Sequence, residues 1–144
     1  MSLVSSIKKV GSDIICAFKD GTSLKTTITE SGFYTPTLDN TTQVDASTPF
    51  KCHWARVGKS VTVSGIFNMD PSASGATTMT MTVPSGMPIS ADSTVPAGGV
   101  ASNKLTSVDV LGIDKASATT VAIRGNPVTR TNATYAFIFM YRMD

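Results

Sequence analysis

Alternation of apolar and polar residues with a period of two recurs along most of the chain. In residues 78–83, for example, Met79, Met81 and Val83 alternate with threonines. A period of two places successive side chains on opposite faces of a β-strand, and no window of a dozen residues sustains the 3.6-residue period of a helix. Many of the polar positions are Thr, whose branched Cβ suits a pleated surface better than a helix. The sequence therefore predicts an all-β protein.

The first 32 residues predict a β-hairpin that precedes the main domain. Residues 12–19 and 22–29 have the pattern of strands, and they flank Asp20-Gly21, a dipeptide that suits the positive φ angles of a two-residue turn. Glu30-Ser31-Gly32 then interrupts the alternation and marks the expected junction. The predicted division is therefore an N-terminal hairpin or arm over residues 1–32 and a β-sandwich module over residues 33–144.

The apolar residues of this hairpin need partners, because a two-stranded hairpin alone is marginally stable in water. We expect the hairpin to be an attachment segment that docks on another protein. The alternative is that it adds two strands to the core sheet of its own domain. The candidate attachment residues are Ile14, Phe18, Leu24 and Ile28.

The remaining residues predict about eight to ten short strands separated by Gly, Pro and Asn turns, which is typical of a sandwich, a jelly roll or a closed barrel. The fold class that we expect is an antiparallel β-sandwich or jelly-roll-like domain. Two polar stretches, residues 39–48 and 70–76, are expected to be loops. The main predicted strands are residues 50–57, 61–69, 78–83, 95–101, 105–113, 119–124 and 133–143.

The last of these strands is apolar on both faces. One face carries the aromatic residues Tyr135, Phe137, Phe139 and Tyr141, and the other carries Ala136, Ile138 and Met140. A strand that is apolar on both sides is buried on both sides, either inside the sandwich or between subunits. Because large exposed apolar patches are rare on monomers, the pattern predicts a homo-oligomer, and we expect a trimer.

Charge and composition exclude several classes of partner. The net charge is +2 and the basic residues are scattered, so no basic patch for nucleic acid is visible. Because no run of about 18 apolar residues occurs, we expect no membrane insertion. The first residues lack the apolar core of a signal peptide, so we expect synthesis in the host cytoplasm, after which the protein stays soluble or is exported only as part of a larger assembly.

Few residues are suited to catalysis or metal binding. His53 is the single histidine, and on a strand its side chain and that of Cys52 point to opposite faces. One histidine and two separated cysteines do not match the usual zinc spacings, and the acidic residues form no recognisable pair or calcium motif. We expect no enzyme activity, no metal and no cofactor. Cys16 and Cys52 are expected to be free thiols, although a disulfide between them is compatible with the sequence.

Several segments of residues 33–144 match a recurring pattern. They are Phe33-Tyr34-Thr35-Pro36-Thr37-Leu38, residues 53–65 with Arg56-Val57-Gly58 before a "VTVSG" strand, Thr82-Val83-Pro84, residues 97–101 and residues 135–139. As a set they resemble a β module of bacteriophage virion proteins, found at the distal ends of tail fibres and spikes and in short stand-alone proteins. The resemblance implies a compact sandwich, often trimeric, on the particle surface, and it assigns no binding residues.

The resemblance and the hairpin together predict a structural protein on the surface of a virion. Because the chain has no fibrous shaft, we expect a capsid decoration, head-fibre or vertex protein, or a short tail fibre. Its expected partners are further copies of itself and other virion proteins. The alternative is an adhesin that binds host-surface carbohydrate through residues 39–48, 70–76 or 125–131. The aromatic residues near predicted loops are Tyr34, Phe50 and Trp54.

Overall fold

The computed structural model describes residues 4–10, 13–18, 23–27, 29–72, 75–92, 94, 97–106 and 108–144. These residues form strands and no helix, which confirms the predicted all-β class. The strands are β1 (Val4–Val10), β2 (Asp13–Phe18), β3 (Ser23–Thr27), β4 (Thr29–Tyr34), β5 (Leu38–Thr42), β6 (Val44–Pro49), β7 (Cys52–Val57), β8 (Ser60–Pro71), β9 (Thr77–Thr82), β10 (Gly98–Asn103), β11 (Val110–Lys115), β12 (Thr120–Gly125) and β13 (Ala133–Arg142).

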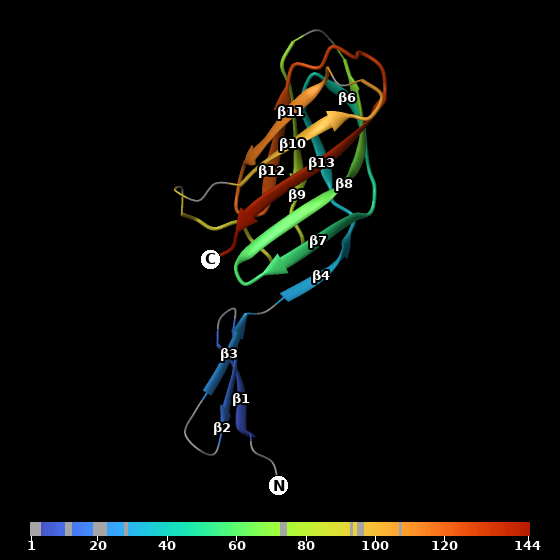
Figure 1. Cartoon of the computed structure of the whole chain (residues 1–144). Helices are drawn as coiled ribbons and strands as arrows, with labels where there is room; N and C mark the ends of the chain where they lie inside the picture. The colour runs from blue at the N-terminus through green and yellow to red at the C-terminus, as the bar shows by residue number, and fades with distance from the viewer. Residues whose placement is uncertain are drawn as a thin grey trace.

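The strands form two antiparallel sheets, a small one near the N-terminus and a large one that contains the rest of the chain (Figure 1). The small sheet has the order β1-β2-β3. In the large sheet the order is β4-β7-β8-β13-β10-β11-β12-β9-β5, and β6 pairs with β8. β7 pairs with the first half of the long strand β8, and β6 pairs with its second half.

The large sheet curls so that its two ends approach each other. The two strands that meet are β5, which pairs with β9, and β6, which pairs with β8. Between them the chain turns at Gln43, whose φ is +52°, and the Ser47 hydroxyl donates a hydrogen bond of 2.6 Å to the Asn40 side-chain oxygen. The curled sheet therefore encloses one core, and the predicted antiparallel β-sandwich is confirmed.

Alternate residues along the strands fill this core. On β9, Met79 and Met81 are fully buried, whereas Thr78 and Thr80 remain partly exposed. Val61 and Phe67 on β8 are buried in the same way. The period-two pattern thus predicted correctly which faces of β8 and β9 are inward.

The predicted hairpin is present, with an additional strand. β2 pairs with β3 in antiparallel register, Cys16 opposite Leu24, and the predicted turn at Asp20-Gly21 lies outside the described residues. β1 adds a third strand that the sequence did not predict, in which Ile7 lies opposite Cys16. Lys8 and Lys9 are exposed residues within this strand.

The predicted interruption at Glu30-Ser31-Gly32 is wrong, because these residues lie within β4 and pair with β7. Gly32 lies opposite Trp54, and a Cβ at position 32 would come within 2.9 Å of the Trp54 ring. Position 32 therefore requires a glycine, because the Trp54 indole occupies the space that a Cβ would need. The large sheet begins at Thr29, four residues before the predicted start of the module.

Two predicted loops and one predicted strand also differ from the structure. Residues 39–48 lie mainly in β5 and β6, and β8 extends through Pro71. β5 and β6 carry mostly polar side chains that are exposed or half-buried, so they lack the apolar alternation that identifies a strand. The strand predicted at residues 105–113 begins only at Val110 and continues to Lys115. Among the described residues no helix is long and apolar enough to cross a membrane.

Candidate functional site

The small N-terminal sheet lies apart from the large sheet, and Figure 1 shows it as a separate unit before β4. Ile7 and Val10 on β1 are exposed, and Ile14 at the start of β2 is half-buried. Thr27 at the end of β3 lies close to Gly58 in the β7–β8 turn. If Gly58 had a Cβ, that atom would lie 3.1 Å from the Thr27 methyl group. The sheet therefore has apolar side chains that are only partly covered.

The four predicted attachment residues are described to different extents. Ile14 lies opposite Lys9 of β1 and Thr26 of β3. Phe18 and Leu24 belong to β2 and β3 by their backbones, but their side chains lie outside the described residues, as does all of Ile28. Sequence reasoning missed the exposed Ile7, because the segment around it shows too little alternation to predict a strand.

The four aromatic residues of β13 lie in the core of the large sheet. Tyr135, Phe137, Phe139 and Tyr141 are buried, and the ring centroids of the last three follow one another at 5.9 and 6.1 Å. The Tyr141 hydroxyl donates a hydrogen bond of 2.9 Å to the Met87 carbonyl oxygen. The opposite face of the strand exposes Ile138 and Met140. The aromatic side of β13 is thus internal, and its aliphatic side faces outward.

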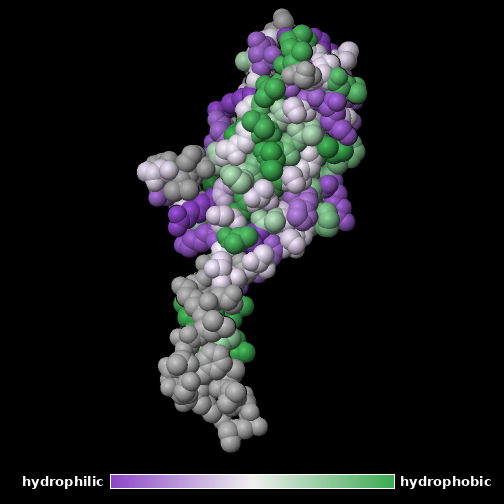
Figure 2. All heavy atoms as spheres, in the orientation of Figure 1, coloured by the Kyte–Doolittle hydropathy of each residue, from purple (hydrophilic) through white to green (hydrophobic). Residues whose placement is uncertain are grey.

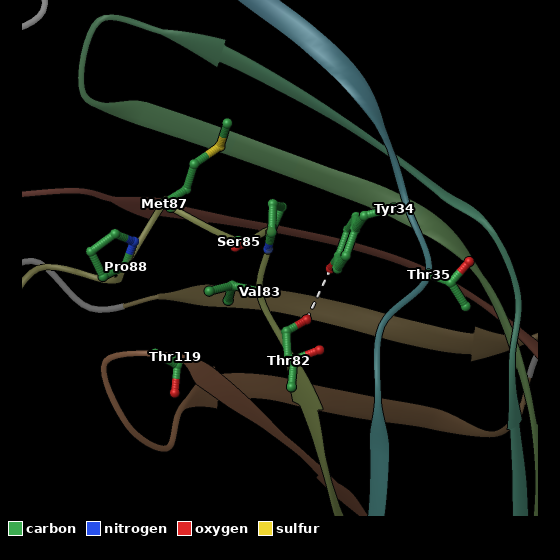
Figure 3. Close-up of a pocket in the computed structure, with 10 residues that line it drawn as sticks. Tyr34, Thr35, Thr82, Val83, Ser85, Met87, Pro88 and Thr119 are labelled. Atoms are coloured by element: carbon green, nitrogen blue, oxygen red, sulfur yellow. Dashed lines mark hydrogen bonds between the residues drawn. The ribbon is translucent and has the colours of Figure 1, made fainter.

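A hollow of about 440 Å³ lies between the end of β4 and the chain that follows β9 (Figure 3). Tyr34 lines it, and its hydroxyl donates a hydrogen bond of 3.0 Å to the Thr82 carbonyl oxygen. Burial raises the pKa of the Tyr34 hydroxyl well above its ordinary value. The other lining residues are small, hydroxylated or apolar: Thr35, Thr82, Val83, Pro84, Ser85, Gly86, Met87, Pro88 and Thr119. Such a hollow offers van der Waals contact and hydroxyl groups, but no acid or base for catalysis.

An exposed aromatic residue beside polar groups lies on the outer side of β4. The Phe33 side chain is 64% exposed, its ring centroid is 5.3 Å from that of His53, and the Lys51 ammonium lies 5.2 Å from the Phe33 centroid. A cation over a ring face is attracted by the ring quadrupole. The sequence had singled out Tyr34, Phe50 and Trp54 instead, although alternation places Phe33 on the face opposite to Tyr34.

A buried carboxylate holds together the loops at one end of the large sheet. Asp109 is 1% exposed and accepts hydrogen bonds from the Val128 amide at 2.5 Å, the Thr129 amide at 3.2 Å and the Asn103 side-chain amide at 3.2 Å. Desolvation by burial raises the pKa of Asp109, but hydrogen bonds led by that of Thr129 outweigh it and lower the pKa below its usual value. Asp109 therefore anchors the β10–β11 and β12–β13 connections and has a structural role.

The two cysteines are both free thiols, as expected. Cys52, the first residue of β7, is buried and donates a hydrogen bond of 3.2 Å to the Phe50 carbonyl oxygen, and desolvation raises its pKa to about 11. No group of three or more His, Cys, Asp or Glu side chains that could hold a metal ion occurs among the described residues.

Comparisons of the chain with family models, curated proteins and solved structures find no match. Any function proposed for the protein therefore rests on its own residues and their arrangement.

Proposed function

We propose that this protein is a non-enzymatic structural module on the surface of a bacteriophage virion and that its N-terminal sheet attaches it to the particle. One observation carries the proposal: the large sheet encloses a core of its own, whereas the described apolar side chains of the small sheet, such as Ile7 and Ile14, are exposed or half-buried. A sheet of three short strands gains stability when its apolar face packs against another surface. The protein beneath would provide that surface for Ile7 and Ile14.

The resemblance of residues 33–144 to virion surface modules supports the proposed location. Among virion surface proteins, a capsid decoration, head-fibre, vertex or short tail-fibre protein fits a chain in which a sandwich follows a small attachment sheet. The proposed partners are other virion proteins and further copies of this chain.

Removal of residues 1–28 tests the division of labour. The remaining chain keeps β4 and its pairing with β7, including the 3.4 Å ion pair between Arg56 and Glu30. We expect it to fold with a urea midpoint close to that of the full chain, because the described core residues all lie between Cys52 and Tyr141. We also expect it to stop co-sedimenting with particles that lack the native protein.

Two point variants of the full chain are the matched controls. Ile7→Asp should weaken co-sedimentation, whereas Ser6→Asp adds the same charge at a neighbouring exposed residue that is already polar and should leave it unchanged. An unfolded truncated chain, or one that still joins particles, would contradict the attachment role of the small sheet.

Binding of host-surface carbohydrate is the second candidate function, and the Phe33 ring favours it. Exposed aromatic faces beside polar side chains are suited to stacking on sugar rings, and His53 and Lys51 lie next to Phe33. Binding of the purified protein to a glycan array, lost in Phe33→Ala, would favour this role over a purely structural one.

A further inference from the structure

The outer face of the large sheet carries an apolar cluster that no described residue covers. Val100 on β10, Val110 on β11, and Ile138 and Met140 on β13 are between 48% and 61% exposed. β13, β10 and β11 are neighbours in the sheet, and Val100 lies directly opposite Ile138. Figure 2 shows hydrophobic side chains gathered along this face. We call these four residues the outer patch.

The surface around the outer patch is made mostly of small, uncharged residues. In the rows of Val100 and Val110 every described outward-facing residue from β8 to β11 is uncharged, and in the row of Met140 the one charged residue is Asp114 on β11, opposite Gly98. The glycines leave open space: a Cβ at Gly98 would meet no atom within 4 Å, and one at Gly112 only the Arg124 carbonyl oxygen at 3.8 Å. A shallow hollow of about 360 Å³ lies beside Met140. The patch therefore combines protruding aliphatic side chains with gaps between them.

Charged side chains occur only at the margins of this surface. Asp114 on β11 is held by Arg124 on β12 at 3.0 Å, and Arg142 lies at the end of β13. A charged partner would find no complementary charge in the centre of the patch. Burial of this centre instead requires a partner that is equally uncharged, because an unpaired charge is costly to desolvate.

We propose that the outer patch is the surface through which a second copy of this chain binds. A symmetric contact places the same residues of two copies near one another around the axis, so charged residues at its centre would repel each other. The centre of the outer patch carries no charged side chain. Aliphatic side chains of one sheet can enter the glycine gaps of the other when two sheets pack about 10 Å apart. The oligomer predicted from the sequence would thus use the Ile138 and Met140 side of β13. The proposal is independent of attachment to a virion.

The molar mass of the full-length protein, measured by light scattering at micromolar concentration, tests the proposal. We expect a mass of at least twice the 15.1 kDa chain mass, at a whole-number multiple of it. Ile138→Glu and Gly112→Lys each place a charge in or beside the patch and should reduce the mass to that of one chain. Gly112→Lys has space for its side chain, so it should fold even where Ile138→Glu does not.

Leu105→Glu is the matched control, because Leu105 is 87% exposed on the β10–β11 connection and lies outside the patch. It should leave the oligomer intact, and circular dichroism should show that all variants compared are folded. A wild-type mass of one chain, or a folded Gly112→Lys variant with the wild-type mass, would overturn the proposal. A monomer that still joins particles would overturn it without affecting the proposed attachment function.

Discussion

Met81→Asp is expected to prevent folding, whereas Thr78→Asp on the same strand should be nearly neutral. Met81 is fully buried in the core, and its replacement would bury an unpaired carboxylate and leave a cavity, at a cost above about 4 kcal/mol. Thr78 lies on the outer face of β9 opposite Arg124, so an aspartate there gains an oppositely charged neighbour and should change stability by less than about 1 kcal/mol. Urea unfolding followed by circular dichroism measures both effects.

A third variant refines this comparison. Thr80 lies on the same outer face, but it is opposite Asp39 of β5. Thr80→Asp should therefore cost more than Thr78→Asp, because like charges directly opposite on neighbouring strands destabilise a sheet. If Met81→Asp and Thr78→Asp have equal effects, the inward face of β9 has been assigned incorrectly.

Asp109→Ala is expected to destabilise the protein by about 3 kcal/mol or more, because each buried donor left without an acceptor costs about 1–3 kcal/mol. The Val128 and Thr129 amides and the Asn103 side chain would lose their shared acceptor. Asp114→Ala, on the neighbouring strand β11, is the matched control: its pair with Arg124 is exposed, and such pairs contribute at most about 1 kcal/mol. Urea titrations of the two variants, with similar slopes, give the comparison. Equal losses in the two variants would contradict a special role for Asp109.

The same carboxylate predicts how stability depends on pH. Folding lowers the pKa of Asp109, so the unfolded chain binds a proton more readily than the folded chain does. Its contribution is therefore fully present above the unfolded pKa of about 3.9 and is lost as the pH falls through the lower folded value. The difference in stability between the wild type and Asp109→Asn should thus shrink on acidification. A difference that grows at low pH would have the wrong sign.

The sequence was most informative where a strand has one buried face. On β9 and β8 the alternation predicted the inward side chains, because burial alone decides which residues are apolar there. β5 and β6 were missed, since these strands close the sheet with exposed polar side chains and are defined by pairing with distant strands. Their partners are separated from them in sequence, and local patterns carry no record of such pairing.

The β10–β11 connection shows a second limit of local patterns. Leu105 and Val108 are apolar, so residues 105–113 were predicted as one strand, yet both side chains are exposed. Asp109 has the same parity as the buried Leu111 and Ile113, and its carboxylate is buried because three donors from the β10 end and the β12–β13 connection surround it. A buried polar cluster of this kind depends on contacts between separate loops, which composition and spacing do not reveal.

The candidate attachment and contact surfaces could be predicted only in part. The last strand was recognised as apolar on both faces, but sequence alone could not decide whether its aromatic or its aliphatic side is internal. The structure places Tyr135 and Phe139 in the core and leaves Ile138 and Met140 exposed. The reason is the neighbouring strand: Phe67 of β8 lies opposite Tyr135, and the two rings stack at 5.5 Å, so the aromatic sides of both strands share the core.

The amount of this protein in purified virions is the most direct test of the proposed function. Quantitative mass spectrometry of particles purified by density gradient would give its copy number relative to the major structural protein. A structural surface module should be present at a fixed ratio in independent preparations and should remain after a high-salt wash, because its attachment buries apolar side chains such as Ile7. A protein that is abundant in infected cells but absent from washed particles would contradict the account.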